Sequence, residues 1–244
     1  MLAVYMNEND KIVDNMVAFP GNFTKKEKEE VKTKNSTKMW CLKDKEEIMQ
    51  VYETFKQKVA EAHTVSKHKT AMRNLTMYVC AINIGLRGGD FCNLKWSDIY
   101  DDNWKFKLHA EYVPEKTRKC HKHIDLTWSS DFETVLGKWR SVINPEDINS
   151  YIFTSQKGGK ITEKAWYKII ESTRKEAGIE QKIGTHGLRK TMANQYIKNS
   201  KDKTQALLEV STMFGHSDLR ITERYACLEN ENIKKTKQKM AFLY

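Results

Sequence analysis

Four side chains in the last third of the chain have the chemistry of a phosphate site. His186 and Arg189 lie one helical turn apart, His216 follows thirty residues after His186, and Tyr225 comes nine residues later. Arginine keeps its charge at any relevant pH and grips phosphate oxygens with parallel donors, and histidine donates to the same oxygens. A tyrosine hydroxyl can act as a covalent nucleophile. We therefore interpret the four as a phosphoryl-transfer site.

Each of these residues has an ordinary structural explanation when it is taken alone. His186 would be a structural histidine, Arg189 a surface charge or ion-pair partner, and Tyr225 a half-buried aromatic residue. Their order on one basic chain favours a common site instead. The other histidines have no comparable neighbours, and we expect surface or structural roles for His63, His68, His109, His121 and His123.

The composition indicates a polyanionic partner. The 244 residues include 42 Lys and Arg against 32 Asp and Glu, a formal net charge of +10. A basic surface attracts nucleic acid and releases the counterions condensed on it. Nucleic acid is therefore the first expected partner, although a basic protein without any nucleic-acid partner would have the same composition.

Neither a membrane nor an oxidising compartment is expected. The mean hydropathy is −0.70, and no apolar run approaches the roughly 18–20 residues of a membrane span. The N-terminus Met1–Met6 lacks the features of a signal peptide, which predicts a cytoplasmic protein. Five scattered cysteines without a Cys-x-x-Cys pair predict free thiols. Residues 120–123 lack a second ligand pair at zinc spacing, so no metal is expected.

Two helices are expected before the first glycine-rich segment. Asp44 and Glu47 predict a capping box, and apolar residues then recur at helical spacing from residue 48 to residue 59. A second apolar helix is expected over about 71–86. The two glycines that follow Arg87 allow the backbone to turn tightly and to approach a ligand closely.

From residue 104 the hydrophobic period changes from helical to alternating. Residues 105–108 and 111–113 alternate before the turn region 114–119, and residues 123–126 alternate after it. We therefore expect a small antiparallel sheet with Lys116 and Lys119 near its tip. Helices are expected again over about 128–142 and 163–177.

The phosphate-binding set lies on the last helices. Thr185 is a candidate N-cap for a helix that places His186 and Arg189 together on one face. The apolar face of that helix is formed by Leu188, Met192 and Tyr196. A further apolar helix ends at Gly215 and presents His216 at its end.

Four segments and one tyrosine combine these features in a specific order. They are Gly85–Asp90, Leu94–Ile99, His186–Arg189 and Phe214–Ser217, followed by Tyr225. In order and separation they resemble the tyrosine recombinases, or phage-integrase family. Any one segment is weak evidence for this resemblance, whereas the whole set in order is specific. The resemblance covers the chain from about residue 42 to its end.

The resemblance implies a role for each matching residue. Arg87 and Arg189 match the arginines that clamp the non-bridging oxygens of the scissile DNA phosphate, and His186 and His216 match its further hydrogen-bonding partners. Tyr225 matches the nucleophile, which forms a 3′-phosphotyrosyl link and frees a 5′-hydroxyl for attack on a partner strand. Cationic donors at these oxygens would stabilise the charge that gathers there in the transition state.

Two further residues are assigned by the same resemblance. Lys116 matches the hairpin lysine that acts as general acid to the leaving oxygen, and Asp90 stands where the family has a supporting acidic residue. The intervals on both sides of Lys116 are longer than the family norm, so Lys119 remains a rival for the general acid. Covalent phosphotyrosine conserves the bond energy, so neither a cofactor, a metal nor ATP is expected to be required.

The resemblance also implies a fold and a domain organisation. The expected fold is mainly α (α+β), a helical catalytic domain over 41–244 with a small antiparallel β-sheet, preceded by an N-terminal tail or linker over 1–40. Full-length members usually carry an additional N-terminal core-binding domain. The chain is therefore expected to be either a minimal recombinase or a catalytic fragment.

The implied activity is site-specific DNA recombination of the integrase or excisionase type, as in phages and other mobile genetic elements. The protein would act as a homo-multimer, a tetramer, on double-stranded DNA, because strand exchange in this family joins two duplexes. Two alternatives remain open at this stage. One is a resolvase or topoisomerase-like relaxer of DNA, and the other is a catalytically inactive DNA-binding regulator on the same scaffold.

Overall fold

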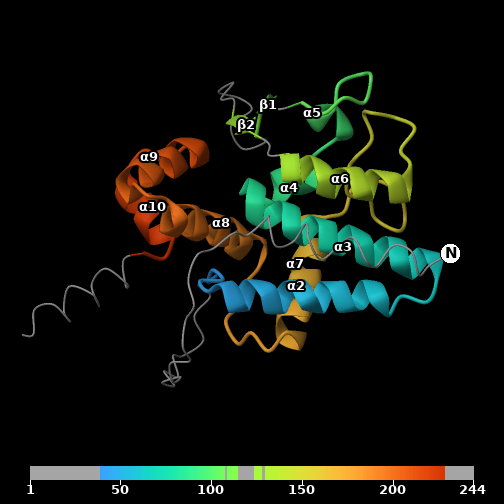
Figure 1. Cartoon of the computed structure of the whole chain (residues 1–244), viewed down its shortest axis with the longest axis horizontal. Coiled ribbons are helices and arrows are strands. Elements are labelled where there is room, and N and C mark those ends of the chain that lie inside the picture. The colour runs from blue at the N-terminus through green and yellow to red at the C-terminus, as the bar shows by residue number, and fades with distance from the viewer. Residues whose placement is uncertain (1–38, 108, 115–123, 128–129, 229–244) are drawn as a thin grey trace, which may run out of the picture. The chain divides into compact units, whose positions relative to one another are not determined.

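Helices dominate the computed structural model, which describes residues 39–107, 109–114, 124–127 and 130–228. These residues belong to one unit that begins at Met39. The helices are α2 (Lys45–Ala60), α3 (Val65–Ile84), α4 (Gly88–Asn93), α5 (Trp96–Ile99), α6 (Ser130–Ile143), α7 (Glu163–Glu176), α8 (Thr185–Asn199), α9 (Lys203–Phe214) and α10 (Leu219–Tyr225) (Figure 1). With the short strands β1 (His109–Tyr112) and β2 (Ile124–Thr127), they confirm the expected mainly α fold with a small antiparallel sheet.

Both early helices differ in detail from their sequence predictions. The predicted capping box is not formed, because Asp44 makes no side-chain cap, and the Glu47 carboxylate accepts from the N–H of Lys43, the residue before the N-cap, at 3.0 Å. Helix α3 begins at Val65, six residues before the prediction, where the Thr64 hydroxyl accepts from the Lys67 N–H. The first turns of α3 are polar, so no apolar stripe marks them.

The sheet is shorter and lies later than the alternation predicted. Strands β1 and β2 pair in antiparallel register, with Tyr112 opposite Ile124. The predicted strand 105–108 is wrong for its described residues, since Phe106 forms only an isolated bridge with Tyr100. The predicted tip of the hairpin lies outside the described residues.

Two hydrophobic cores meet along α8. The larger core gathers residues from α2 to α7, with Phe55, Trp96 and Trp166 among its fully buried side chains. The smaller core is built from α8, α9 and the end of α10, around Val210 and Phe214, and Tyr225 packs against it. Helix α8 contributes Leu188 to the first core and several residues to the second, and it contacts both α3 and α9. Figure 1 shows α8 between α3 and the α9–α10 pair.

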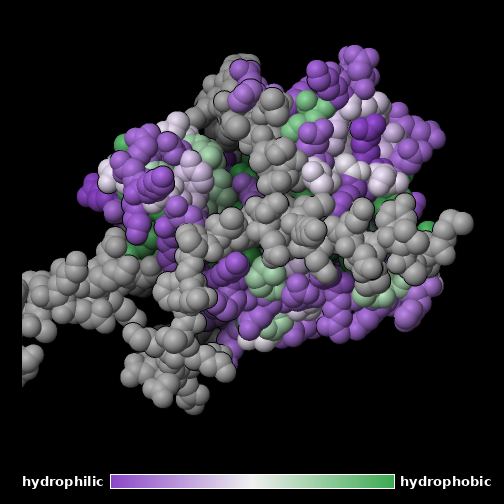
Figure 2. Space-filling view, in the orientation of Figure 1, coloured by the Kyte–Doolittle hydropathy of each residue, from purple (hydrophilic) through white to green (hydrophobic). Residues whose placement is uncertain are grey.

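The exposed surface of the described part is mostly polar. Hydrophilic residues cover the α9–α10 region on the face seen in Figure 2, and hydrophobic residues appear there in small separate patches. Tyr196 was expected on the apolar face of α8, but it is 41% exposed, and its hydroxyl donates to the Glu209 carboxylate at 2.7 Å. Among the described helices, none is long and apolar enough to cross a membrane.

Gly85 ends α3 and allows the first test of this architecture. Its φ of 69° is left-handed, and a Cβ there would lie 3.1 Å from Met192 and 3.2 Å from Phe214. Substitution Gly85→Ala should lower the free energy of unfolding by more than the roughly 1–2 kcal/mol of the backbone strain alone, as measured by urea denaturation. Gly158 is the matched control, because its φ is 83° and its Cβ would meet nothing within 4 Å. Equal losses in the two variants would contradict close packing at Gly85.

Candidate active site

The end of α3 delivers the first arginine. Gly85 turns the chain in the left-handed conformation, and Arg87 then occupies the N-cap position of α4. The tight turn expected at Gly88 and Gly89 is wrong, because Gly88 begins α4 and the left-handed glycine is Gly85. Gly88 instead permits close packing, since a Cβ there would collide with the Glu163 carboxylate and the Thr185 side chain.

Helix α8 delivers the second arginine into a buried position. Arg189 is 3% exposed, and its Nη1 donates to the Gly85 carbonyl oxygen at 2.7 Å. Its guanidinium carbon lies 3.7 Å from the centroid of the Phe214 ring. Arg189 therefore contacts the end of α3 and the end of α9 at once.

The start of α8 differs from the expected capping by Thr185. Gly184 is the N-cap, and Thr185 is already the first helical residue. The Thr185 hydroxyl donates to the Glu163 carboxylate at 3.0 Å and so faces away from a capping position. Glu163 therefore contacts Thr185, the residue before His186, and packs against Gly88, the residue after Arg87.

The second histidine is held at the end of α9. Gly215 ends that helix in the left-handed conformation, as its sequence position predicted, and the His216 N–H donates to the Ser211 carbonyl at 2.9 Å. The Nδ1 atom of His216 lies 2.9 Å from the Thr222 hydroxyl, which is fully buried. Because Nδ1 is engaged by Thr222, Nε2 is the nitrogen that can face a phosphate.

Tyr225 lies at the end of α10, among these groups. Its hydroxyl is 3.3 Å from Nδ1 of His186, and the positive charge of Arg189 is close enough to act on its pKa. The Tyr225 ring lies edge-on to both histidine rings, with centroid distances of 4.9 Å to His186 and 5.4 Å to His216. The ammonium group of Lys190 lies 5.5 Å from the centre of the Tyr225 ring.

The remaining predicted residues fall into two groups. Arg87 is close enough for its charge to lower the pKa of both His186 and His216. Asp90 is buried, and its charge acts on Arg189. The structure thus brings together six of the seven predicted residues. Lys116 and its rival Lys119 lie outside the described residues, so the choice between them stays a prediction.

Asp90 also links the site to the sheet. The Tyr112 hydroxyl on β1 donates to the Asp90 carbonyl at 3.3 Å, and it lies 3.5 Å from the Asp90 carboxylate. The strand that leads toward Lys116 is therefore attached directly to α4. A carboxylate at this position can orient the site without touching a substrate.

Burial sets the protonation states of the site. It lowers the pKa of His186 from 6.5 to about 4, and the positive charges of Lys190, Arg189 and Arg87 add to this effect, although part of the side chain is exposed. Burial also raises the pKa of Tyr225 from 10 to about 12, against the opposing effect of the two arginines. At neutral pH the free protein therefore holds a neutral phenol beside a neutral imidazole.

Arg189 remains cationic under the same conditions. Burial lowers its pKa from 12.5 to about 10, and the nearby Tyr225 opposes this shift. The pKa of His216 is lowered as well, by burial and then by Arg189 and Arg87. The site thus combines two guanidinium groups with two histidines that are neutral at pH 7, an arrangement that favours an anion.

Three supporting residues were not found from the sequence. They are Glu163, which bridges to Thr185; Lys190, whose Nζ also donates to the Met39 carbonyl at 3.0 Å; and Thr222, which orients His216. Only Lys190 had a sequence signal, its position directly after Arg189. The other two are selected by packing between distant segments, which periodicity does not reveal.

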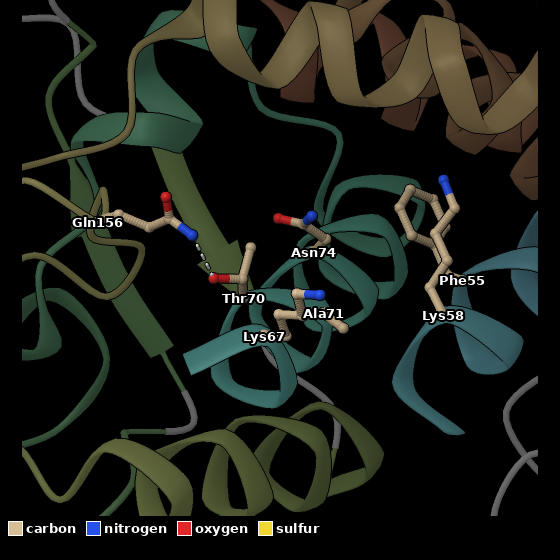
Figure 3. Close-up of a pocket in the computed structure, with 7 residues that line it drawn as sticks. All are labelled: Phe55, Lys58, Lys67, Thr70, Ala71, Asn74 and Gln156. Carbon is tan, nitrogen blue, oxygen red and sulfur yellow. Dashed lines mark hydrogen bonds between the residues drawn. The ribbon is translucent and has the colours of Figure 1, made fainter. Parts of the chain in front are cut away.

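A hollow elsewhere in the described structure contains none of the predicted site residues. A shallow hollow between α2, α3 and the turn near residue 156 is lined by Phe55, Lys58, Lys67, Thr70, Ala71, Asn74 and Gln156, with Gln156 donating to Thr70 at 3.0 Å (Figure 3). None of the predicted site residues lines it. Within the described ranges, no three His, Cys, Asp or Glu side chains gather as metal ligands.

Known proteins resemble this chain in sequence. The sequence model of the phage integrase family matches residues 44–232. Tyrosine recombinase XerD of Listeria monocytogenes serotype 4b (strain F2365) is 26% identical over 168 residues, which are 67% of this chain and 52% of the relative. The chain therefore spans about half the length of the curated relatives it matches.

Solved structures share the fold. The crystal structure of XerA recombinase has a TM-score of 0.60 at 19% identity and covers 87% of this chain and 68% of its own. A lambda integrase tetramer bound to a Holliday junction has a TM-score of 0.53 at 18% identity and covers 79% of this chain and 49% of its own. At these identities the likeness shows a common fold.

The pKa of His186 provides a direct test of the electrostatics. In NMR titrations of the free protein, the His186 ring signals should stay in the neutral form from pH 7.5 to about 5.5, because the pKa is near 4. Since the unfolded chain binds this proton near pH 6.5, His186 should make folding less stable as the pH falls from about 6.5 toward 4. The variant His186→Asn identifies the signals. An inflection near pH 6.5 would contradict a buried imidazole flanked by cations.

Proposed function

The chain belongs to the phage integrase family, and from this premise we propose that it is a site-specific tyrosine recombinase that cleaves and rejoins DNA through Tyr225. The observation that carries the proposal is the position of the Tyr225 hydroxyl, 3.3 Å from the neutral His186 and close enough to the buried Arg189 for that charge to act on its pKa. A phenol beside a proton acceptor and a fixed guanidinium is the arrangement that an attack on phosphate requires.

In the proposed cleavage step the phosphate is held before it is attacked. Arg87 and Arg189 bind its non-bridging oxygens, and His216 donates through Nε2 while Thr222 holds the other ring nitrogen. The Tyr225 oxygen attacks phosphorus as its proton passes to Nδ1 of His186. Because the pKa of Tyr225 is raised to about 12, the proton must leave during the attack rather than before it.

Cleavage breaks the bond between phosphorus and the 5′ oxygen. The products are a 3′-phosphotyrosyl link to Tyr225 and a free 5′-hydroxyl, whose proton comes from the general acid, proposed as Lys116. Attack by a 5′-hydroxyl of a partner strand reverses the step and restores the phenol. The phosphotyrosyl bond keeps the energy of the phosphodiester, so rejoining needs no ATP.

The proposal extends to domain and assembly. We assign residues 41–244 to the catalytic domain, with residues 1–40 as a tail or linker. A homo-multimer, a tetramer, on double-stranded DNA is proposed because exchange between two duplexes requires four cleavages. Support for this assembly comes from the formal charge of +10 and from the similar lambda integrase, which forms a tetramer on a Holliday junction.

Covalent capture on DNA tests the nucleophile. Nicked duplexes tiled across the DNA that flanks the coding sequence are incubated with the protein and resolved under denaturing conditions. The wild type should form an SDS-stable adduct on one of them and should do so in the presence of a chelator, whereas Tyr225→Phe should bind DNA without forming the adduct. Tyr196→Phe is the control, because its hydroxyl lies on α8 outside the site and bonds Glu209.

The outcomes of that experiment separate the candidate functions. An adduct that survives Tyr225→Phe would exclude Tyr225 as the nucleophile. DNA binding by the wild type without any adduct would favour an inactive DNA-binding regulator. Adduct formation that yields only relaxed plasmid, without recombinant products, would identify a relaxing enzyme.

The general acid can be identified with a modified leaving group. Lys116→Ala should slow adduct formation on ordinary DNA by roughly 10²–10⁴-fold, the usual contribution of acid catalysis. A duplex with sulfur in place of the bridging 5′ oxygen should restore most of the rate, because a thiolate leaves without a proton. Lys119→Ala is the matched control and should change neither rate appreciably. Rescue by sulfur in Lys119→Ala rather than Lys116→Ala would reverse the assignment.

A further inference from the structure

A cationic side chain lies over the ring of the proposed nucleophile. The ammonium nitrogen of Lys190 is 5.5 Å from the centroid of the Tyr225 ring. An aromatic ring carries partial negative charge on its face, and a cation within about 6 Å of the centroid is attracted to it. The contact therefore favours one position of the Tyr225 ring over others.

The ammonium group of Lys190 is itself held in place. Its Nζ donates to the Met39 carbonyl at 3.0 Å, and the side chain is half-buried. Residues 39–43 are fixed in turn, because the Leu42 N–H donates to the buried Thr191 hydroxyl on α8 at 2.9 Å. A lysine side chain loses much rotamer freedom when it is held in one position, and the bond to a fixed carbonyl offsets that loss.

Aromatic rings also surround Tyr225. The rings of His186, Phe214 and His216 meet it at angles of 83°, 78° and 62°, with centroid distances of 4.9, 5.5 and 5.4 Å. Such steep contacts between aromatic rings are favourable. Because both histidines are neutral in the free protein at pH 7, Lys190 adds a positive charge that these ring contacts lack.

Lys190 also lies on the same face of α8 as the proposed proton acceptor. His186 and Lys190 are four residues apart on that helix, a spacing that makes their side chains neighbours. The positive charge of Lys190 lowers the pKa of His186, which agrees with this spacing. The ammonium group therefore lies beside both partners of the proposed proton transfer.

We propose that Lys190 is a positioning residue for the attack by Tyr225. Its ammonium group, anchored on the Met39 carbonyl, holds the phenol ring where the hydroxyl reaches His186. This inference rests on the proposed recombinase function. Negative charge grows on the phenol as its proton passes to Nδ1 of His186, and the attraction to a fixed ammonium group grows with it. The contact is therefore stronger during the attack than before it, which raises the rate of cleavage rather than the affinity for DNA.

Lys198 is a matched control on the same helix. Its Nζ donates to the Lys43 carbonyl at 3.3 Å, so it too joins α8 to residues 39–43. Lys198 follows Lys190 by two helical turns, about 12 Å along the axis of α8. An effect that comes only from weakening the junction between α8 and residues 39–43 should therefore appear when either lysine is replaced.

The experiment measures DNA affinity and the rate of adduct formation at saturating nicked DNA separately, in the full chain. Lys190→Met keeps the apolar stem and removes the charge, so it should slow adduct formation roughly 10-fold, the equivalent of one cation–π contact, with little change in affinity. Lys190→Arg should recover most of the rate, because a guanidinium also stacks on aromatic rings. Lys198→Met should keep the wild-type rate. Equal slowing in Lys198→Met would overturn the proposal, and so would weaker DNA binding by Lys190→Met without slowing at saturation, which would make Lys190 a phosphate contact.

A second readout needs neither DNA nor activity. In NMR spectra of the free protein with isotope-labelled tyrosine, the variant Tyr225→Phe identifies the ring signals of Tyr225. These signals should move in Lys190→Met and stay in place in Lys198→Met. Unchanged signals in Lys190→Met would overturn the positioning role. If the wild type forms no adduct on any duplex, the recombinase function fails, and the ring signals alone then decide whether Lys190 positions the Tyr225 ring.

Discussion

The buried guanidinium of Arg189 is the interaction on which the site depends. It joins three segments, since it donates to the Gly85 carbonyl, stacks on Phe214 and lies close enough to Tyr225 for its charge to act on the pKa of the phenol. Burial lowers its pKa to about 10, so burial disfavours the charged form that the site requires. The fold tolerates this because the Gly85 carbonyl and the Phe214 ring, which lie side by side, both contact the guanidinium. A phosphate bound here would offset the same cost, so the site is built to favour an anion.

Burial and nearby positive charges have opposite effects on the pKa of Tyr225, the proposed nucleophile. Two arginines near Tyr225 would by themselves lower its pKa, yet burial outweighs them and raises it to about 12. The same burial, reinforced by Lys190, keeps His186 neutral, so its Nδ1 can accept the phenol proton. The phenol thus stays protonated in the free protein at neutral pH, and in the proposed cleavage it would lose its proton only as it attacks the phosphate. This explains how a positively charged site can hold a tyrosine without generating a phenolate at rest.

The sequence predicted the residues of this site better than the contacts that hold them in place. The types and spacing of His186, Arg189, His216 and Tyr225 are local features, so residue chemistry was enough to group them. The family resemblance added Arg87, which lies about a hundred residues earlier in the chain. The helical fold and the small sheet followed from periodicity, but the boundaries failed where caps rather than apolar residues decide them. Thr64 starts α3 after a polar stretch, and Gly184 rather than Thr185 caps α8, because the Thr185 hydroxyl is drawn to Glu163. Such choices depend on contacts between segments that are far apart in sequence.

Helix α8 is held from both sides. On one side Arg189 is fixed to Gly85, and on the other residues 39–43 lie so close that a Cβ on Gly187 would collide with the Trp40 carbonyl. Lys190 bonds the Met39 carbonyl while its ammonium group lies over the Tyr225 ring. These contacts of residues 39–43 therefore help to fix the position of α8, although none of the predicted site residues lies in that segment.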